Sequence, residues 1–284
     1  MPATSAPAVE IDGLVMRYGD KVAVDGLSLT VERGSITAVL GPNGAGKTTT
    51  LETCEGFRKP QGGTVRVLGL DPVSQRRELL PRIGVMLQSG GAWSGVRAVE
   101  MLRHIASLHA HPLDVDMLVE RLGLGDCGKT PFRRLSGGQQ QRLGLAMAVV
   151  GRPELVFVDE PTAGMDPAAR RTTWELLQEL RADGVTIVLT THYLEEAERL
   201  ADMVHIIDRG ALVASGTPEE LTRGSSATVR LVVDRELETS ASDALRASID
   251  DWSRTHGVDV QSISFGSRTL EDVFLHLTGR ELES

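Results

Sequence analysis

Residues 41–49, Gly-Pro-Asn-Gly-Ala-Gly-Lys-Thr-Thr, constrain the fold of this chain more than any other segment. They satisfy the pattern G-x-x-x-x-G-K-[ST] of a phosphate-binding loop. The apolar, β-branched stretch Ile36 to Leu40 precedes them, and Thr50 to Glu55 has the character of a helix start. The pattern therefore predicts a buried strand, a loop and a helix, with backbone N–H groups of the loop pointing inward at a phosphate.

Each residue type in this loop has a chemical reason to be there. The Lys47 ammonium is expected to reach the β- and γ-phosphates of a nucleotide, and the Thr48 hydroxyl to bind Mg²⁺. A Gly-rich turn that contains Lys-Thr by chance is disfavoured by the flanking strand and helix. The residues expected to bind the nucleotide are Gly41, Pro42, Asn43, Gly44, Ala45, Gly46, Lys47, Thr48 and Thr49.

Composition narrows the class of protein. A chain of 284 residues favours one large domain, or one domain with a small addition. The net charge of −9 argues against a surface that coats nucleic acid. The two cysteines, Cys54 and Cys127, form no C-x-x-C pattern, which argues against a zinc ribbon and fits a reducing compartment. No apolar run is long enough to span a membrane, and Met1 to Pro7 is expected to be a frayed end rather than a signal peptide.

Strands alternate with helices after the loop, which favours a mostly parallel sheet covered on both faces. Two alternating stretches, Ala8–Val15 and Gly26–Val31, predict an added antiparallel layer. A linker-like stretch, Thr217–Ser226, then marks a boundary, so the main domain is expected over 1–223. Residues 224–284 are expected to form a small α+β domain that packs on the main domain or on a second copy, because about 60 residues are marginally stable alone.

Two acids follow a second apolar strand, Leu155 to Val158. The strand would deliver Asp159 and Glu160 to its carboxyl end, where ligands collect in open α/β sheets. Asp159 is a candidate Mg²⁺ ligand, and Glu160 is a candidate general base for an attacking water. The alternative is an acidic strand end that solvent satisfies.

Four further positions are weaker signals when taken singly. Ser136 with Gly137-Gly138 opens a helix and could bind an anion, although a plain helix cap explains it as well. His192 follows a strand and could contact a γ-phosphate, or be a surface or core residue. Gln88 could complete a Mg²⁺ shell, and Tyr18 could stack on adenine or be a half-buried strand aromatic.

In this order, the motifs resemble the ATP-binding subunit of an ABC transporter over roughly residues 8–220. The resemblance assigns Tyr18 to the A-loop, residues 41–49 to the Walker A motif, Gln88 to the Q-loop, Leu135, Ser136, Gly137, Gly138 and Gln139 to the signature, Asp159 and Glu160 to Walker B, Asp166 to the D-loop and His192 to the switch histidine. The terminal run Leu270-Glu271-Asp272-Val273-Phe274 further resembles the daunorubicin-resistance type, a family of ABC-2 exporters of drugs, antibiotics or lipids.

The resemblance implies a P-loop NTPase cassette with a helical subdomain at about 89–150. It implies an ATPase with ATP and Mg²⁺ as cofactors, in which Glu160, His192 and Lys47 are catalytic, and Thr48, Gln88 and Asp159 hold the metal. Two copies would sandwich each ATP between the Walker A loop of one copy and the signature of the other. A separate polytopic membrane subunit would complete the exporter at the cytoplasmic face of the cell membrane, with no nucleic acid bound. The alternatives are the ATPase subunit of an importer, or a soluble ABC ATPase that acts on ribosomes or DNA.

Overall fold

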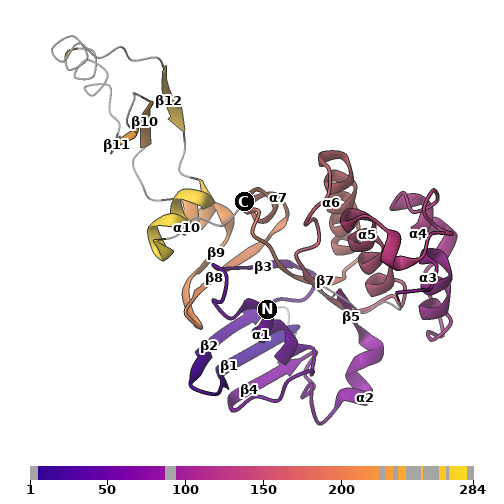
Figure 1. The fold of residues 1–284 in the computed structure, drawn as a ribbon. Helices are drawn as coiled ribbons and strands as arrows, with labels where there is room; N and C mark the ends of the chain where they lie inside the picture. Colours follow the sequence, from indigo (N-terminus) through magenta and orange to yellow (C-terminus); the bar gives the residue numbers. More distant parts are fainter. Residues whose placement is uncertain are drawn as a thin grey trace, which may run out of the picture.

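A mixed six-stranded sheet forms the centre of the molecule. The computed structural model describes residues 6–86, 94–223, 228–232, 236–240, 251, 262–266 and 269–279. The strand order is β5-β6-β7-β3-β8-β9, and every neighbouring pair is parallel except β8 and β9 (Figure 1). The strands are β3 (Ile36–Leu40), β5 (Ile83–Met86), β6 (Leu155–Asp159), β7 (Thr186–Thr190), β8 (Met203–Asp208) and β9 (Ala211–Gly216).

The central strands are buried on both faces, as their continuous apolar sequences predict. Successive side chains point to opposite faces. Val39 and Phe157 therefore join one hydrophobic core, whereas Leu40 and Val158 join the other.

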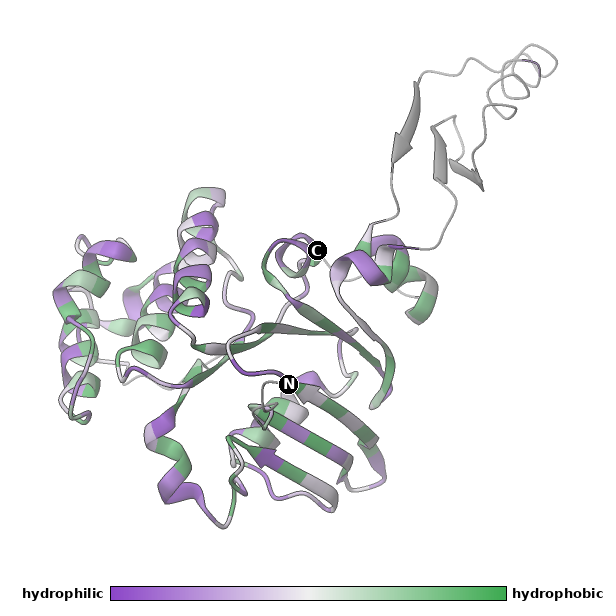
Figure 2. Cartoon of the chain, turned by 180° about the vertical axis from the view of Figure 1, so that it is seen from behind, coloured by the Kyte–Doolittle hydropathy of each residue, from purple (hydrophilic) through white to green (hydrophobic). Residues whose placement is uncertain are grey.

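The first core lies between this sheet and an antiparallel layer. That layer has the strand order β2-β1-β4, from β1 (Val9–Tyr18), β2 (Lys21–Val31) and β4 (Gly62–Val67), and Figure 2 shows apolar and polar residues alternating along it. Helix α1 (Lys47–Cys54) contributes Leu51 and Cys54 to this core. The predicted antiparallel layer is confirmed, although β2 begins at Lys21 and runs through Gly26 instead of beginning there.

The second core is covered by helices. They are α3 (Ala98–Ala106), α4 (Val115–Arg121), α5 (Gly137–Val149) and α6 (Pro167–Ala182). The sequence pattern from Val96 to about Leu122 predicts a helical stretch that Pro112 interrupts, and the structure divides it into α3 and α4 with Pro112 between them. Asp114 caps α4 by accepting from the N–H groups of Asp116 and Met117.

Shorter helical turns are α2 (Arg76–Leu79) and the 3-10 segments Leu80–Arg82 and Phe132–Arg134.

The C-terminal region supplies further elements. They are α7 (Leu194–Leu200), α8 (Pro218–Thr222), α10 (Leu270–Thr278) and an antiparallel sheet of order β11-β10-β12, from β10 (Thr228–Val232), β11 (Glu236–Ser240) and β12 (Ser262–Gly266). The predicted linker character of Thr217–Ser226 is wrong over α8, because Thr217 and Glu220 form a capping box that starts a helix. The sequence analysis also missed β11. The pattern of Ser242–Arg254 predicts a helix, but nearly all of that segment lies outside the described residues.

Helix α10 packs beside α7 and α8 (Figure 1). Its residues Leu270, Val273 and Phe274 are buried in the same core as Ala197 and Leu200. The buried face of α10 therefore lies against the main domain, which is one of the two places expected for the C-terminal region. Among the residues that the structure describes, no helix combines the length and the apolar character needed to cross a membrane.

Candidate active site

The phosphate-binding loop joins β3 to α1 at the carboxyl end of the parallel strands, as the motif predicts. Gly46 is the N-cap of α1 and has φ 107°, a conformation that L side chains rarely adopt. A Cβ on Gly46 would lie 2.5 Å from the Ala23 carbonyl oxygen, and one on Gly41 would lie 2.3 Å from that of Ile207. Both positions therefore require glycine for backbone conformation or for space.

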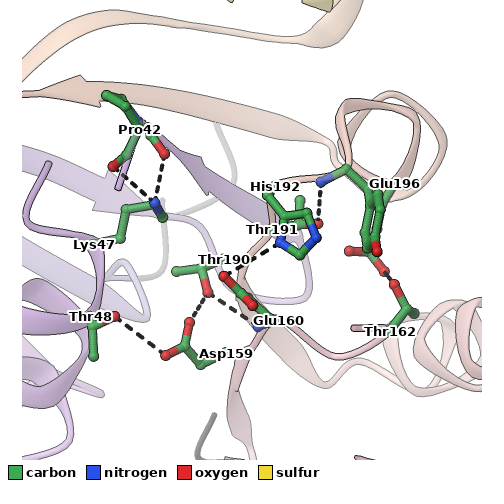
Figure 3. Close-up of polar contacts among 12 residues, drawn as sticks. Pro42, Lys47, Thr48, Asp159, Glu160, Thr162, Thr190, Thr191, His192 and Glu196 are labelled. Carbon is green, nitrogen blue, oxygen red and sulfur yellow. Dashed lines mark hydrogen bonds and ion pairs between the residues drawn. The ribbon is translucent and has the colours of Figure 1, made fainter. Parts of the chain in front are cut away.

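The Lys47 side chain folds back onto the backbone at the start of the phosphate-binding loop. Its Nζ donates to the carbonyl oxygens of Gly41 at 2.6 Å and Pro42 at 3.2 Å (Figure 3). Burial lowers the pKa of Lys47, while the negative charges of Glu160 and Asp159 oppose that shift. The ammonium is thus held at the carbonyl oxygens of Gly41 and Pro42, at the start of the loop.

Asp159 ends β6 and faces the loop. Its Oδ2 accepts from the Thr48 hydroxyl at 3.5 Å, and its Oδ1 accepts from the Thr190 hydroxyl. Burial raises the pKa of Asp159, whereas the hydrogen bond from Thr190 and the charge of Lys47 act in the opposite direction. A carboxylate and a hydroxyl oxygen side by side are hard oxygen donors, which is the donor type that Mg²⁺ prefers. The residues present fit that ion.

Glu160 has a strained backbone. Its φ is 52°, which is uncommon for a residue with a side chain, and its N–H donates to the Thr190 carbonyl oxygen at 3.0 Å. Its Oε1 lies 3.5 Å from Nδ1 of His192, and both side chains are only partly exposed (Figure 3). The strained turn aims the carboxylate at His192 and toward the loop.

Tyr18 lies at the rim of a hollow of about 220 Å³ that follows the loop. Its hydroxyl is 3.4 Å from the Thr49 hydroxyl, and the guanidinium of Arg58 is 5.0 Å from its ring centre. The ring is 40% exposed and so offers area for stacking. The hollow is lined by Tyr18, Lys21, Ala23, Asn43, Gly44, Gly46, Lys47, Thr48, Thr49 and Glu160.

The Ser-Gly-Gly segment lies elsewhere. Ser136 caps α5 in a reciprocal capping box with Gln139, and Leu135 is buried before it. A Cβ on Gly138 would lie 3.3 Å from the Gly164 carbonyl oxygen, so this segment borders the turn that precedes α6. Asp166 caps α6, and the hydrogen bond from the Ala169 N–H is the main cause of its lowered pKa. Residues 135–139 do not line the 220 Å³ hollow of their own chain.

The structure thus brings Tyr18, the loop, Asp159, Glu160 and His192 to one edge of the sheet and leaves the Ser-Gly-Gly segment and Asp166 apart from them. Gln88 lies outside the described residues. Sequence reasoning missed Thr190, whose hydroxyl and carbonyl position both acids. Its place at the carboxyl end of β7, the apolar strand next to β6, is the signal that could have found it.

Comparisons with known proteins agree with this geometry. A profile of the ABC transporter family matches residues 24–163. The daunorubicin resistance ATP-binding protein DrrA3 of Streptomyces coeruleorubidus is 36% identical, with 96% of each chain covered. This chain belongs to the ABC transporter ATP-binding subunits.

Other relatives extend the comparison. The Nod factor export ATP-binding protein I of Ralstonia nicotianae is 34% identical, over 98% of this chain and 96% of the relative. A solved ATP-binding subunit of an ABC transporter has a TM-score of 0.70 at 26% identity, covering 76% of this chain and 92% of that one. The chain therefore has the P-loop NTPase fold of ABC cassettes, and it is an ATP-binding and ATP-hydrolysing subunit of an exporter.

Proposed function

We propose that this chain powers an ABC-2 exporter of a drug, an antibiotic or a lipid-like molecule, through a separate membrane subunit at the cytoplasmic face of the cell membrane. The observation that carries the chemistry is the approach of Glu160 to His192 beside the phosphate-binding loop, at 3.5 Å. The substrate class is inferred from relatives whose names describe daunorubicin resistance and Nod factor export. The division into a cassette over 1–223 and a small domain over 224–284 is part of the proposal.

The site residues take distinct roles in this proposal. Lys47 and the loop N–H groups bind the phosphates, and Tyr18 stacks on the adenine. Thr48 and Asp159 hold Mg²⁺, which neutralises charge on the phosphates when bound, and Gln88 joins them. Glu160 accepts a proton from the attacking water.

His192 completes the hydrolytic arrangement. Its side chain is 23% exposed and that of Glu160, which lines the hollow, is 17% exposed, so both are partly screened from bulk water. In this position His192 orients the water and contacts the γ-phosphate. The pair therefore supplies positioning and proton transfer, which are the main contributions a protein makes to phosphoryl transfer.

We infer that the Ser-Gly-Gly segment completes the site of a second copy. Ser136 is exposed at the N-terminus of a 13-residue helix, where N–H groups and the helix dipole attract an anion. Residues 135–139 do not reach the nucleotide hollow of their own chain. A homodimer in the ATP-bound state would place Leu135, Ser136, Gly137, Gly138 and Gln139 against the γ-phosphate of the partner and bring Asp166 to the interface.

A second hollow suits the membrane subunit. It has a volume of about 490 Å³ and lies between β5, α3 and α5. Phe57, Ile105, His109 and Phe132 are among the residues that line it, and Phe57 is 50% exposed. A mostly apolar hollow of this kind fits a short helix of a membrane protein better than it fits a solvated surface.

Replacing Glu160 tests the proposed chemistry. We expect Glu160→Gln to lower ATP hydrolysis by about a hundredfold or more, because the amide cannot act as a general base. ATP binding should persist, so an ATP-bound dimer should accumulate in size-exclusion chromatography. Wild-type turnover in this variant would contradict the assignment of Glu160.

Ser136→Arg tests the arrangement between two copies. The added side chain should leave ATP binding intact, because Ser136 does not line its own nucleotide hollow. Hydrolysis should stop, because the arginine would occupy the partner's γ-phosphate position. Loss of ATP binding by this variant would show that the sandwich arrangement is wrong.

Affinity capture of the Glu160→Gln chain from its native cell, in ATP and mild detergent, tests the transport role. A polytopic membrane protein at stoichiometric yield is the expected result, and its type distinguishes exporter from importer. Ribosomal or DNA-repair proteins without a membrane partner would instead support a soluble ABC ATPase.

A further inference from the structure

A buried carboxylate outside the nucleotide site connects the segments that carry the hydrolytic residues. Glu196 on α7 is 0% exposed. Its Oε1 accepts from the Thr162 hydroxyl at 3.0 Å (Figure 3). The same oxygen accepts from the Trp174 indole N–H at 2.8 Å. Burying a carboxylate is costly unless hydrogen bonds compensate, so these two donors fix the position of Glu196 within the core.

The two donors and the acceptor come from three different segments. Thr162 follows Glu160 by two residues, and Trp174 lies on α6, the helix that Asp166 caps. Glu196 lies on α7, which begins two residues after His192. The carboxylate therefore ties the segment of the general base, the helix of the predicted D-loop and the segment of the histidine to one another.

A second set of contacts links the His192 ring to α6 through Tyr193 and Arg170. The ring of His192 lies 4.0 Å from that of Tyr193, and the guanidinium of Arg170 on α6 lies 4.3 Å from the Tyr193 ring centre. The Tyr193 N–H donates to the Thr191 hydroxyl at 2.9 Å, which fixes the turn after His192. A movement of α6 would thus reach His192 through both Glu196 and Tyr193.

We propose that Glu196 is a positioning residue for ATP hydrolysis. It holds α7 against the β6–α6 connection so that His192 stays within reach of Glu160, and it passes movement of α6 to the histidine. Glu196 touches neither nucleotide nor metal in this proposal, which rests on the proposed function of Glu160 and His192. Loss of its hydrogen bonds should slow hydrolysis while leaving ATP binding in place, because the phosphate-binding loop makes none of these contacts.

Thr162 offers a matched pair of variants. Thr162→Val removes the donated hydrogen bond at nearly constant volume, and Thr162→Ser retains the hydroxyl. We expect kcat to fall by about tenfold or more in Thr162→Val, because small misplacements of catalytic groups are costly. The KM for ATP should stay within about twofold, and Thr162→Ser should restore most of the rate. Trp174→Phe, which removes only the other N–H donor and part of the ring, should reproduce the kcat effect.

The control is Thr222→Val. The Thr222 hydroxyl bonds to the Pro218 carbonyl oxygen within α8, away from the nucleotide site, so kcat should be unchanged.

An ATP-bound dimer should accumulate with Thr162→Val, as with Glu160→Gln, because ATP binds and hydrolysis is slow. A purely structural role would instead weaken ATP binding and leave the chain monomeric.

Two results would overturn the inference. One is an unchanged kcat in both Thr162→Val and Trp174→Phe. The other is a slower rate at low ATP that comes entirely from a raised KM, with kcat unchanged, and that Thr162→Ser does not reverse. If Glu160→Gln itself hydrolyses ATP at the wild-type rate, the proposed function fails, and that outcome is distinct from either of these.

Discussion

At the scale of single residues, the site depends on backbone positions as much as on side-chain chemistry. Gly46 adopts φ 107° beside the Ala23 carbonyl, and Glu160 adopts φ 52° beside His192. Such conformations cost about 1–3 kcal/mol each when a side chain is present, and packing around them must compensate.

Gly46→Ala should therefore be far more damaging than an equivalent change elsewhere. The new methyl group meets the Ala23 carbonyl oxygen at 2.5 Å, so we expect loss of ATP binding together with a fall in unfolding free energy. Gly26→Ala is the matched control, because its φ is also positive at 70° but nothing lies within 4 Å of the new methyl group. That variant should cost only about 1–2 kcal/mol and still bind ATP. Thermal unfolding and nucleotide titration measure both, and equal losses would contradict this account.

Glu55 gives the fold a dependence on pH. It is 3% exposed, and burial, with smaller contributions from the charges of Asp159 and Glu52, raises its pKa to about 8. The folded state therefore holds a proton that the unfolded chain releases near its ordinary value of 4.5. Stability from this group falls as pH rises from about 4.5 to 8, and the full penalty applies above 8.

We expect Glu55→Gln to remove this dependence. The neutral amide avoids the cost of a buried charge, so the free energy of unfolding at pH 8.5 should rise by about 2–4 kcal/mol, with little change at pH 4.5. Denaturant unfolding at both pH values, without nucleotide or Mg²⁺, measures the difference. An equal effect at both would show that Glu55 does not titrate in this range.

At the scale of elements, α10 shows how a distant segment joins the main core. Its N–H at Leu270 donates to the Glu198 carboxylate of α7 at 2.6 Å, and its capping box of Thr269 and Asp272 defines where it starts. Three of its apolar side chains are buried against α7 and α8. The helix thus stabilises the same element that follows His192.

Two adjacent residues of α10 test this packing. Phe274 is 1% exposed and Leu275 is 40% exposed. Phe274→Ala should lower the free energy of unfolding by about 3–5 kcal/mol, because it removes a large side chain from a packed core. Leu275→Ala should change it by no more than about 1 kcal/mol. Denaturant unfolding of both variants gives the comparison, and similar losses would mean that α10 is not packed as described.

At the scale of the whole molecule, the proposed coupling requires two surfaces to act together. The Ser-Gly-Gly end of α5 would meet a second copy, while the 490 Å³ hollow beside β5 would receive the membrane subunit. Both involve α5, since Gly137 and Gly144 of that helix line the hollow. One helix can therefore transmit closure of the dimer to the membrane partner.

Phe57→Asp should separate these two surfaces. The charge would enter a mostly apolar hollow, so co-purification with the membrane subunit should fall by at least about tenfold, a loss of about 1.4 kcal/mol in binding. ATP hydrolysis by the isolated chain should be unchanged, because Phe57 does not line the nucleotide hollow. Full retention of the membrane subunit would exclude the hollow as its docking site.

The sequence alone determined the identity of the loop, the acids at the end of β6 and the fold class, because these depend on local patterns. The strand, the Gly-rich turn and the helix of the phosphate-binding loop are adjacent in the chain. The apolar run that ends at Asp159 and Glu160 by itself predicts a buried strand. Helix α8 and strand β11 are not predicted from the sequence, because elements of five residues show little periodicity. The roles of individual site residues remain predictions at every scale.

Only the tertiary structure decided which distant residues meet. Thr190 donates a hydrogen bond to Asp159 because β6 and β7 are neighbouring strands. Glu196 accepts hydrogen bonds from Thr162 and Trp174 because α7 returns to the edge of the sheet where β6 ends. No spacing in the chain encodes these meetings, since each pair is separated by more than 20 residues. Sheet order and helix packing place these groups, and burial then makes each hydrogen bond between them consequential.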